Sequence, residues 1–158
     1  MAEITDSDSY VVERSVDIDA PAAAIYPHLV GFREWTAWSP WEDLDPNLFR
    51  TYSGAASGVG AVYEWSGNRK AGQGRMEIEA ASAPTALAVQ LDFVKPFKSS
   101  STASFALTPT DSGTRVTWSM VGRKTLMTKF MGVFMSMDKM IGPDFEKGLA
   151  RLKALVES

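Results

Sequence analysis

Hydrophobic and polar residues alternate one by one over most of the chain between residues 47 and 121. A period of two places successive side chains on opposite faces of a strand, so that one face is covered and the other meets water. Turn-forming pairs such as Gly67-Asn68 and Ala83-Pro84 separate the alternating stretches. The pattern predicts an antiparallel meander of six strands, at residues 48–53, 61–66, 74–82, 86–94, 99–107 and 114–121.

The same alternation sorts the side chains of these strands into two sets. The apolar set is expected to face inward and consists of Tyr63, Trp65, Met76, Ile78, Leu87, Val89, Leu91, Phe93, Ala103, Phe105, Leu107, Val116, Trp118 and Met120. The opposite set carries the acids Glu64, Glu77, Glu79 and Asp92, which we expect to meet solvent. We therefore expect no acid on the inward face of these strands.

A further strand is predicted at residues 10–18, where Val12, Val16 and Ile18 form an apolar face. Arg14 lies on this same face. We interpret it as a surface arginine near the end of the strand, with a place at a cavity mouth or a pairing across the sheet edge as alternatives. Residues 1–9 are polar and acidic and are predicted to form a flexible tail, followed by one domain over residues 10–158.

Two short helical segments are predicted after this first strand. Asp19-Ala20-Pro21 begins the first, because proline suits the first turn of a helix, and Pro27 is expected to kink or shorten it. The second segment carries tryptophans at a spacing of three, Trp35, Trp38 and Trp41. This spacing predicts a helical or 3₁₀ turn with its rings on one side.

The C-terminal segment, residues 126 to about 156, has the period of a long helix. Its apolar stripe recurs every three or four residues and consists of Phe130, Phe134, Met137, Ile141, Phe145, Leu149, Leu152 and Val156. Gly142-Pro143 interrupts this segment and predicts a kink or break there. We expect this helix to cover the apolar face of the sheet.

Composition excludes several kinds of chemistry. The chain of 158 residues has 16 Lys and Arg against 19 Asp and Glu, a net charge of −3, which argues against a nucleic-acid partner. It has no cysteine and one histidine, which excludes thiolate and multi-histidine metal sites, and we expect no metal and no cofactor. The acidic N-terminus does not resemble a signal peptide, and no apolar run is long enough to span a membrane. We expect a cytoplasmic protein without integral membrane association.

The order of these elements is accompanied by a set of short motifs. They are Ile18-Asp19-Ala20-Pro21, Trp35-Thr36-Ala37-Trp38-Ser39-Pro40-Trp41, Gly58-Val59-Gly60-Ala61-Val62-Tyr63-Glu64-Trp65, Gly113-Thr114-Arg115-Val116-Thr117-Trp118 and Phe145-Glu146-Lys147-Gly148-Leu149. From Tyr10 to the C-terminus the chain resembles the START-like (SRPBCC) superfamily, which has the helix-grip fold. Within it, the chain is most similar to the polyketide cyclase/dehydratase-like branch of small bacterial proteins.

The resemblance implies an α+β fold, in which a curved seven-stranded antiparallel sheet wraps around a long C-terminal helix, with two short helices after strand 1. It also implies an apolar cavity between the sheet and this helix. Members of the superfamily bind lipids, sterols, polyketides and plant hormones, and a minority catalyse cyclisation or dehydration. The expected partner is therefore a small hydrophobic molecule, lipid-like or polyketide-like.

Aromatic and methionine side chains would form the walls of such a cavity, because thioethers and rings adapt to apolar ligands. The candidate ligand-binding residues are Trp38, Trp41, Tyr63, Trp65, Met76, Phe93, Phe105, Trp118, Met131, Phe134 and Met135. The alternative is that these side chains simply form the core.

Two further functions remain open beside ligand binding. A cyclase or dehydratase would need an acid or base, for which His28 and Tyr63 are the candidates, and the absence of an evident buried acid counts against it. A protein-interaction module of the chaperone-cofactor kind would show an exposed apolar patch, and the sequence does not locate one.

Overall fold

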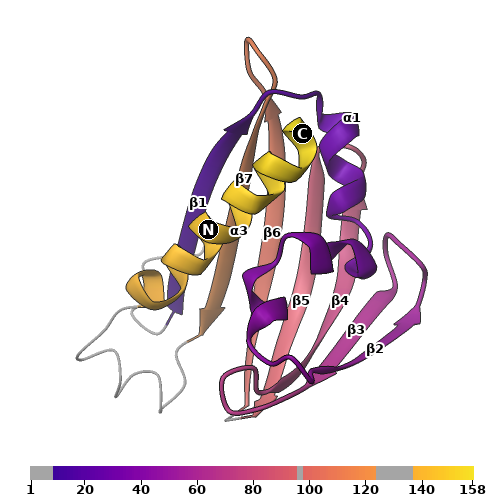
Figure 1. Cartoon of the computed structure of the whole chain (residues 1–158), viewed down its shortest axis with the longest axis vertical. Helices are drawn as coiled ribbons and strands as arrows, with labels where there is room; N and C mark the ends of the chain where they lie inside the picture. Colours follow the sequence, from indigo (N-terminus) through magenta and orange to yellow (C-terminus); the bar gives the residue numbers. More distant parts are fainter. Residues whose placement is uncertain (1–8, 96–97, 124–136) are drawn as a thin grey trace.

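The protein is described by a computed structural model over residues 9–95, 98–123 and 137–158. Seven antiparallel strands form one sheet in the order β1-β7-β6-β5-β4-β3-β2 (Figure 1). The strands are β1 (Ser9–Ile18), β2 (Phe49–Gly54), β3 (Ala61–Ser66), β4 (Gln73–Ser82), β5 (Ala86–Lys95), β6 (Ser99–Pro109) and β7 (Thr114–Arg123). Sequence neighbours pair throughout the meander from β2 to β7, and β1 returns to close the far edge beside β7.

The predicted strands are confirmed, each within two residues of its observed ends. Ser9, which the sequence placed in the tail, begins β1 and lies opposite Arg123 in the register of β1 and β7. The rest of the predicted tail lies outside the described residues. The tight connection between β2 and β3 requires glycine, since Gly54 and Gly60 both have positive φ, at 69° and 94°.

The helical elements that the structure describes lie on one face of the sheet (Figure 1). They are α1 (Ala22–Ile25), the 3₁₀ turns η1 (Tyr26–His28), η2 (Phe32–Ala37) and η3 (Pro40–Asp43), and the long helix α3 (Met137–Glu157). Helix α1 is short because the chain passes into a 3₁₀ turn at Tyr26, with Pro27 near its start, as Pro27 predicted. Helix α3 crosses β1, β7 and β6, while η2 and η3 lie on the same face, over the strands nearer the β2 edge (Figure 1).

The inward and outward faces of the strands are those that alternation predicted. Register pairs inward residues with one another, for example Phe105 with Trp118 and Leu107 with Val116. The most deeply buried of the large side chains come from the strands, α1, the residues that end the 3₁₀ turns, and α3: Trp38, Phe105, Phe145, Ile18, Ile25, Leu29, Ile78, Leu87, Leu149 and Leu152. The tryptophan segment forms the predicted 3₁₀ turns, and the rings of Trp35 and Trp38 lie 4.9 Å apart.

A kink or break was predicted at Gly142-Pro143. The helix is not broken there, since α3 continues as one helix from Met137 through Pro143 to Glu157. A proline inside a helix removes one donor from the hydrogen-bond ladder, and tertiary contacts on both sides of this position hold the helix together. The expected start of the helix near residue 126, with Phe130 and Phe134, lies outside the described residues.

Arg14 also differs from its prediction, since it is not a surface arginine at the end of a strand. Its guanidinium lies between β1 and α3, donating from Nη1 to Asp138 Oδ1 at 2.7 Å and from Nε to Glu146 Oε2 at 2.7 Å. A second bond joins Nη2 to Asp138 Oδ2 at 3.0 Å. The guanidinium fills the space that a Cβ at Gly142 would need, so the glycine admits the arginine beneath the helix.

Candidate ligand-binding site

A cavity of about 260 Å³ lies between the inward face of the sheet, the turns η2 and η3, and the N-terminal half of α3. Most of its lining is apolar. The lining residues are Trp35, Ser39, Trp41, Glu42, Leu48, Tyr63, Trp65, Lys70, Ala71, Met76, Leu91, Phe93, Ala103, Trp118, Met120, Ile141 and Phe145. The cavity therefore has the composition of a small-molecule site, with many apolar walls and few polar groups.

Six of the predicted ligand-binding residues line this cavity: Trp41, Tyr63, Trp65, Met76, Phe93 and Trp118. Trp38 and Phe105 do not, because each is packed in the core behind it with at most 1% of its surface exposed. Met131, Phe134 and Met135 lie outside the described residues. A role in ligand binding stays a prediction for all eleven.

Aromatic rings hold two walls of the cavity in place. On the sheet side, Tyr63 stacks on Trp65 with ring centroids 5.8 Å apart, and Phe93 meets the edge of Trp65 at 5.5 Å. On the helix side, Trp118 stacks on Phe145 at 4.0 Å with the ring planes 3° apart. Such pairs fix ring orientation beyond the effect of apolar burial alone. The walls are thus ordered by contacts among themselves.

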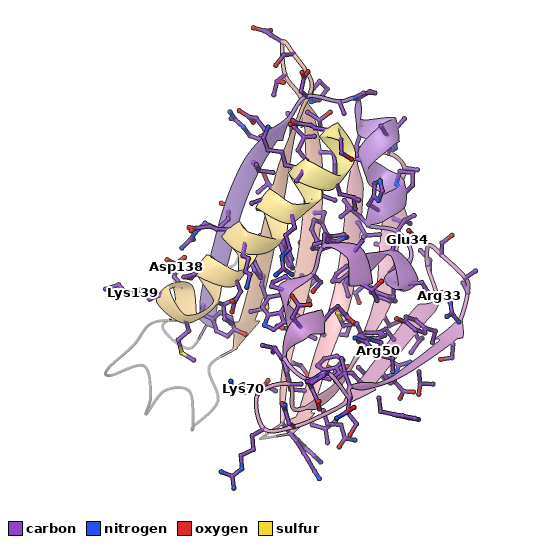
Figure 2. The ribbon with its side chains drawn as sticks, viewed as in Figure 1. Arg33, Glu34, Arg50, Lys70, Asp138 and Lys139 are labelled. Atoms are coloured by element: carbon purple, nitrogen blue, oxygen red, sulfur yellow. The ribbon has the colours of Figure 1, made fainter. Side chains whose placement is uncertain are left out.

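The lower rim is shaped by the connection between β3 and β4. The Asn68 side-chain oxygen accepts hydrogen bonds from the backbone N–H groups of Lys70 and Ala71, each at 3.0 Å, which folds this turn. The indole N–H of Trp65 donates to the Ala71 carbonyl at 2.9 Å and ties the turn to the cavity wall. Figure 2 shows Lys70 at this lower end of the molecule. The rim therefore places a cation beside an apolar interior.

Glu42, the acid in the cavity lining, comes from η3. Its side chain is 8% exposed and is held between two partners. Arg50 Nε of β2 donates to Glu42 Oε1 at 2.6 Å, and the Tyr63 hydroxyl of β3 donates to Glu42 Oε2 at 3.0 Å. We call Glu42, Arg50 and Tyr63 the acid corner.

Electrostatics at the acid corner keep Tyr63 protonated. Burial raises the pKa of the Tyr63 phenol well above its ordinary value, and the neighbouring Glu42 carboxylate raises it further. The hydrogen bond to Glu42 also raises the already high pKa of Arg50. The corner is thus an ion pair between a buried carboxylate and a partly exposed guanidinium, with a neutral phenol bonded to the carboxylate.

The absence of an evident buried acid, which counted against a cyclase or dehydratase, is corrected by Glu42, whose buried side chain lines the cavity. The strand acids do lie off the inward face, as alternation predicted, but Glu42 belongs to a 3₁₀ turn, to which the alternation of strands does not apply. Its partners Arg50 and Tyr63 are 8 and 21 residues away, so only the fold brings the three together. The sequence signal was the acid next to Trp41 in a segment already predicted to face inward.

His28 lies outside the cavity, in η1, and is partly buried. Its backbone carbonyl accepts a hydrogen bond from Trp38 Nε1 at 2.9 Å, so the observed contact of this residue is structural. Of the two candidates for acid–base chemistry, Tyr63 is the one in the cavity wall. The structure does not bring His28 and Tyr63 together in this cavity.

The indole N–H of Trp118 is a polar group with unusual surroundings. Within the part of the chain that the structure describes, it is the one buried side-chain nitrogen or oxygen without a hydrogen-bond partner. Other indoles of the cluster are satisfied, since Trp35 and Trp38 donate to backbone carbonyls at 2.8 and 2.9 Å. A buried unpaired donor costs about 1–3 kcal/mol. It adds a second polar feature beside an apolar site.

No helix within residues 9–95, 98–123 and 137–158 is both long and apolar enough to cross a membrane. In the same part of the chain, no three His, Asp or Glu side chains gather as a metal ion would require.

Comparisons with known proteins agree with this architecture. Residues 10–157 match the family model described as polyketide cyclase / dehydrase and lipid transport. No curated protein matches the sequence.

Solved structures share the fold at low sequence identity. Protein CV1439 from Chromobacterium violaceum has a TM-score of 0.65 and 13% identity, over 96% of this chain and 98% of that one. Protein MLL2253 from Mesorhizobium loti has a TM-score of 0.63 and 22% identity, over 94% and 96%. The di-domain ARO/CYC StfQ from the steffimycin biosynthetic pathway has a TM-score of 0.69 and 11% identity, over 94% of this chain and 51% of that one.

The helix-grip fold that the sequence motifs implied is thereby confirmed. The match to the family model extends over nearly the whole chain, from β1 to the end of α3. The chain belongs to the polyketide cyclase / dehydrase and lipid transport family, within the START-like (SRPBCC) superfamily.

Proposed function

We propose that the protein binds a small hydrophobic or aromatic molecule in the cavity between the sheet and α3. The observation that carries the proposal is an apolar, ring-lined cavity of about 260 Å³ with the buried carboxylate of Glu42 in its wall. Small-molecule sites usually combine many apolar contacts with a few polar groups that fix orientation. The acid corner supplies such polar groups.

The size of the cavity supports a compact ligand. Its volume lies just below the usual range of about 300–1,000 Å³ for drug-sized ligands. Affinity would come from apolar area removed from water, at roughly 25 cal/mol per Å². A molecule of two or three fused rings would therefore fit this cavity better than a long acyl chain. Membership of a family described by both polyketide chemistry and lipid transport supports the same ligand class.

A bound molecule can be sought directly by native mass spectrometry of the gently purified full-length chain, followed by denaturing extraction. The expected result is a defined adduct that is lost on denaturation. Ala103 lines the cavity, and a larger side chain at this position would fill part of its volume. We expect Ala103→Leu to abolish the adduct or reduce its occupancy at least tenfold.

A matched control lies on the same strand. Ala106 is on the outward face of β6 and is exposed, so Ala106→Leu adds the same atoms outside the cavity. We expect this variant to keep the adduct. Equal loss in both variants would contradict the cavity as the binding site, and an adduct that survives Ala103→Leu would do so as well.

A second candidate function is a cyclase or dehydratase reaction, which one observation favours. Glu42 places a carboxylate against a neutral phenol inside an apolar cavity, where it is available as a general base. Much of the rate acceleration would then come from holding a flexible substrate in a reactive conformation. Glu42→Gln should remove turnover of a substrate while the substrate still binds. Unchanged turnover would exclude Glu42 from the chemistry.

A further inference from the structure

Of the two members of the acid corner that line the cavity, only Tyr63 has a polar side-chain hydrogen, and that hydrogen is already donated. Tyr63 has one hydroxyl hydrogen and donates it to Glu42 Oε2 at 3.0 Å. Arg50 donates from Nε to Glu42 Oε1 at 2.6 Å and from Nη2 to the Glu42 carbonyl at 3.3 Å. The cavity itself is lined by Glu42 and Tyr63, whereas Arg50 is not among its lining residues.

The two groups of the acid corner that face the cavity, Glu42 and Tyr63, can therefore only accept hydrogen bonds. A carboxylate has about four lone-pair sites and no hydrogen, and the two bonds just described occupy two of those sites. A phenol whose hydrogen is already donated offers only its oxygen lone pairs. Burial raises the pKa of Tyr63 and keeps that hydrogen in place at neutral pH. This wall of the cavity accepts and does not donate.

Charge at the corner is balanced. The Arg50 guanidinium compensates the Glu42 carboxylate at 2.6 Å, and Lys70 adds a further positive charge at the rim. A cationic ligand would gain little from a carboxylate that is already paired and would meet Lys70 on entry. An anionic head group directed at the acid corner would place its oxygens against acceptors, with no free donor there to hold them. The unpaired indole N–H of Trp118 belongs to β7 and is not part of this corner.

We infer that the cavity selects an uncharged ligand that places a hydroxyl donor, phenolic or enolic, against Glu42. This inference rests on the proposed function, and it narrows the ligand class within it. An aromatic molecule with a free hydroxyl satisfies the unused acceptor sites of Glu42 and leaves the apolar walls in contact with its rings. The corresponding ether lacks the donor, and the corresponding acid carries a charge that the corner does not match.

Three two-ring probes separate these possibilities by isothermal titration calorimetry on the full-length chain. The probes are 2-naphthol, 2-methoxynaphthalene and 2-naphthoate, which share one ring system and differ at the polar end. We expect 2-naphthol to bind roughly tenfold more tightly than the ether, the effect of one hydrogen bond to a charged group. We expect 2-naphthoate to bind most weakly.

The variant Glu42→Gln tests the residue assigned to this preference. Glutamine keeps the size of the side chain and can still accept from Arg50, while its amide nitrogen brings donors into the corner. We expect 2-naphthol to lose its advantage over 2-methoxynaphthalene in this variant. Glu64→Gln is the matched control, because Glu64 lies on the same strand as Tyr63 and is exposed, and it should leave the preference unchanged.

The outcomes distinguish the inference from the proposed function. Equal binding of the naphthol and its ether by the wild type would overturn the inference and leave the proposed function standing. The inference would also fail if the preference survived Glu42→Gln. If none of the three probes bound to the folded wild type, the proposed function would itself be contradicted.

A second variant covers the case in which Glu42→Gln does not fold. Tyr63→Phe removes the phenol and leaves Glu42 with one more free acceptor site. The preference for 2-naphthol should therefore persist or increase in Tyr63→Phe. Its loss there would overturn the assignment to Glu42.

Discussion

The two halves of α3 meet the sheet in different ways. The C-terminal half packs directly into the core, where Leu149 and Leu152 are at most 1% exposed. Beside the N-terminal half, Arg14 passes between β1 and the helix, and Ile141 borders the cavity. One helix thus contributes to the core at one end and borders the cavity at the other.

Two glycines of α3 mark the difference. At Gly148 the helix lies against the core, because a Cβ there would stand 3.0 Å from both Pro40 Cδ and Trp118 Cζ3. At Gly142 the space that a Cβ would need is filled by the guanidinium of Arg14. The missing side chain therefore allows close apolar packing at Gly148 and leaves room for the Arg14 guanidinium at Gly142.

The largest expected effect comes from truncating an apolar side chain in each half. Leu152→Ala empties a fully buried position, and we expect a loss of about 2–5 kcal/mol in the free energy of unfolding. Ile141→Ala removes a partly buried side chain beside an existing cavity, and we expect a loss of about 1 kcal/mol. Urea denaturation followed by circular dichroism measures both. Equal losses would contradict the contrast between the two halves.

Enlarging a small residue gives the complementary test. Gly148→Leu forces atoms into closely packed surroundings and should cost about 1–3 kcal/mol of unfolding free energy. Ala103→Leu extends into the cavity and should cost less than about 1 kcal/mol. Thermal unfolding of the two variants and of the wild type compares them directly. A larger loss in Ala103→Leu would show that the cavity does not admit extra atoms.

The smallest expected effect concerns Arg14 and pH. The hydrogen bond from Arg14 lowers the pKa of Asp138 in the folded protein. This pair therefore contributes stability above the unfolded aspartate pKa of about 3.9, and loses it as the pH falls through the lower folded-state value. Arg14→Met should be less stable than the wild type at neutral pH, and the difference should narrow in acid.

Salt and a control variant complete this comparison. Because Asp138 and Glu146 are about half exposed or more, at 49% and 62%, added salt should also narrow the difference. Arg115→Met breaks the more exposed pair with Asp17, so its effect at neutral pH should be smaller than that of Arg14→Met. A difference for Arg14→Met that is independent of both pH and salt would assign the role of Arg14 to packing alone.

Period and turn chemistry predicted the strands because each strand has one covered face and one wet face. The same alternation could not separate core from cavity. Phe105 on β6 and Trp65 on β3 both lie on the inward, apolar face that alternation predicts, yet Phe105 is packed in the core while Trp65 lines the cavity. Which of them borders empty space depends on how closely the turns and α3 approach, and that distance is not a local property of a strand.

The acid corner and the position of Arg14 were beyond prediction for a related reason. Glu42 meets Tyr63 only because η3 folds over β3, and Arg14 meets Asp138 across 124 residues of chain. Polar residues that serve such contacts interrupt the local pattern or lie outside it. Arg14 was such an interruption, and the simpler interpretation as a surface residue was wrong.

The ring-lined cavity also has an optical consequence. Four of the five tryptophans of the chain, Trp35, Trp41, Trp65 and Trp118, line it, and Trp38 lies directly behind them. The rings of Trp35, Trp38 and Trp41 each lie within 6.3 Å of Trp118, close enough to share excitation energy. Almost all of the intrinsic ultraviolet emission of the protein therefore originates at one place. A quenching molecule bound in the cavity would lower nearly all of the tryptophan fluorescence of the protein, so that intrinsic fluorescence would report binding without any label.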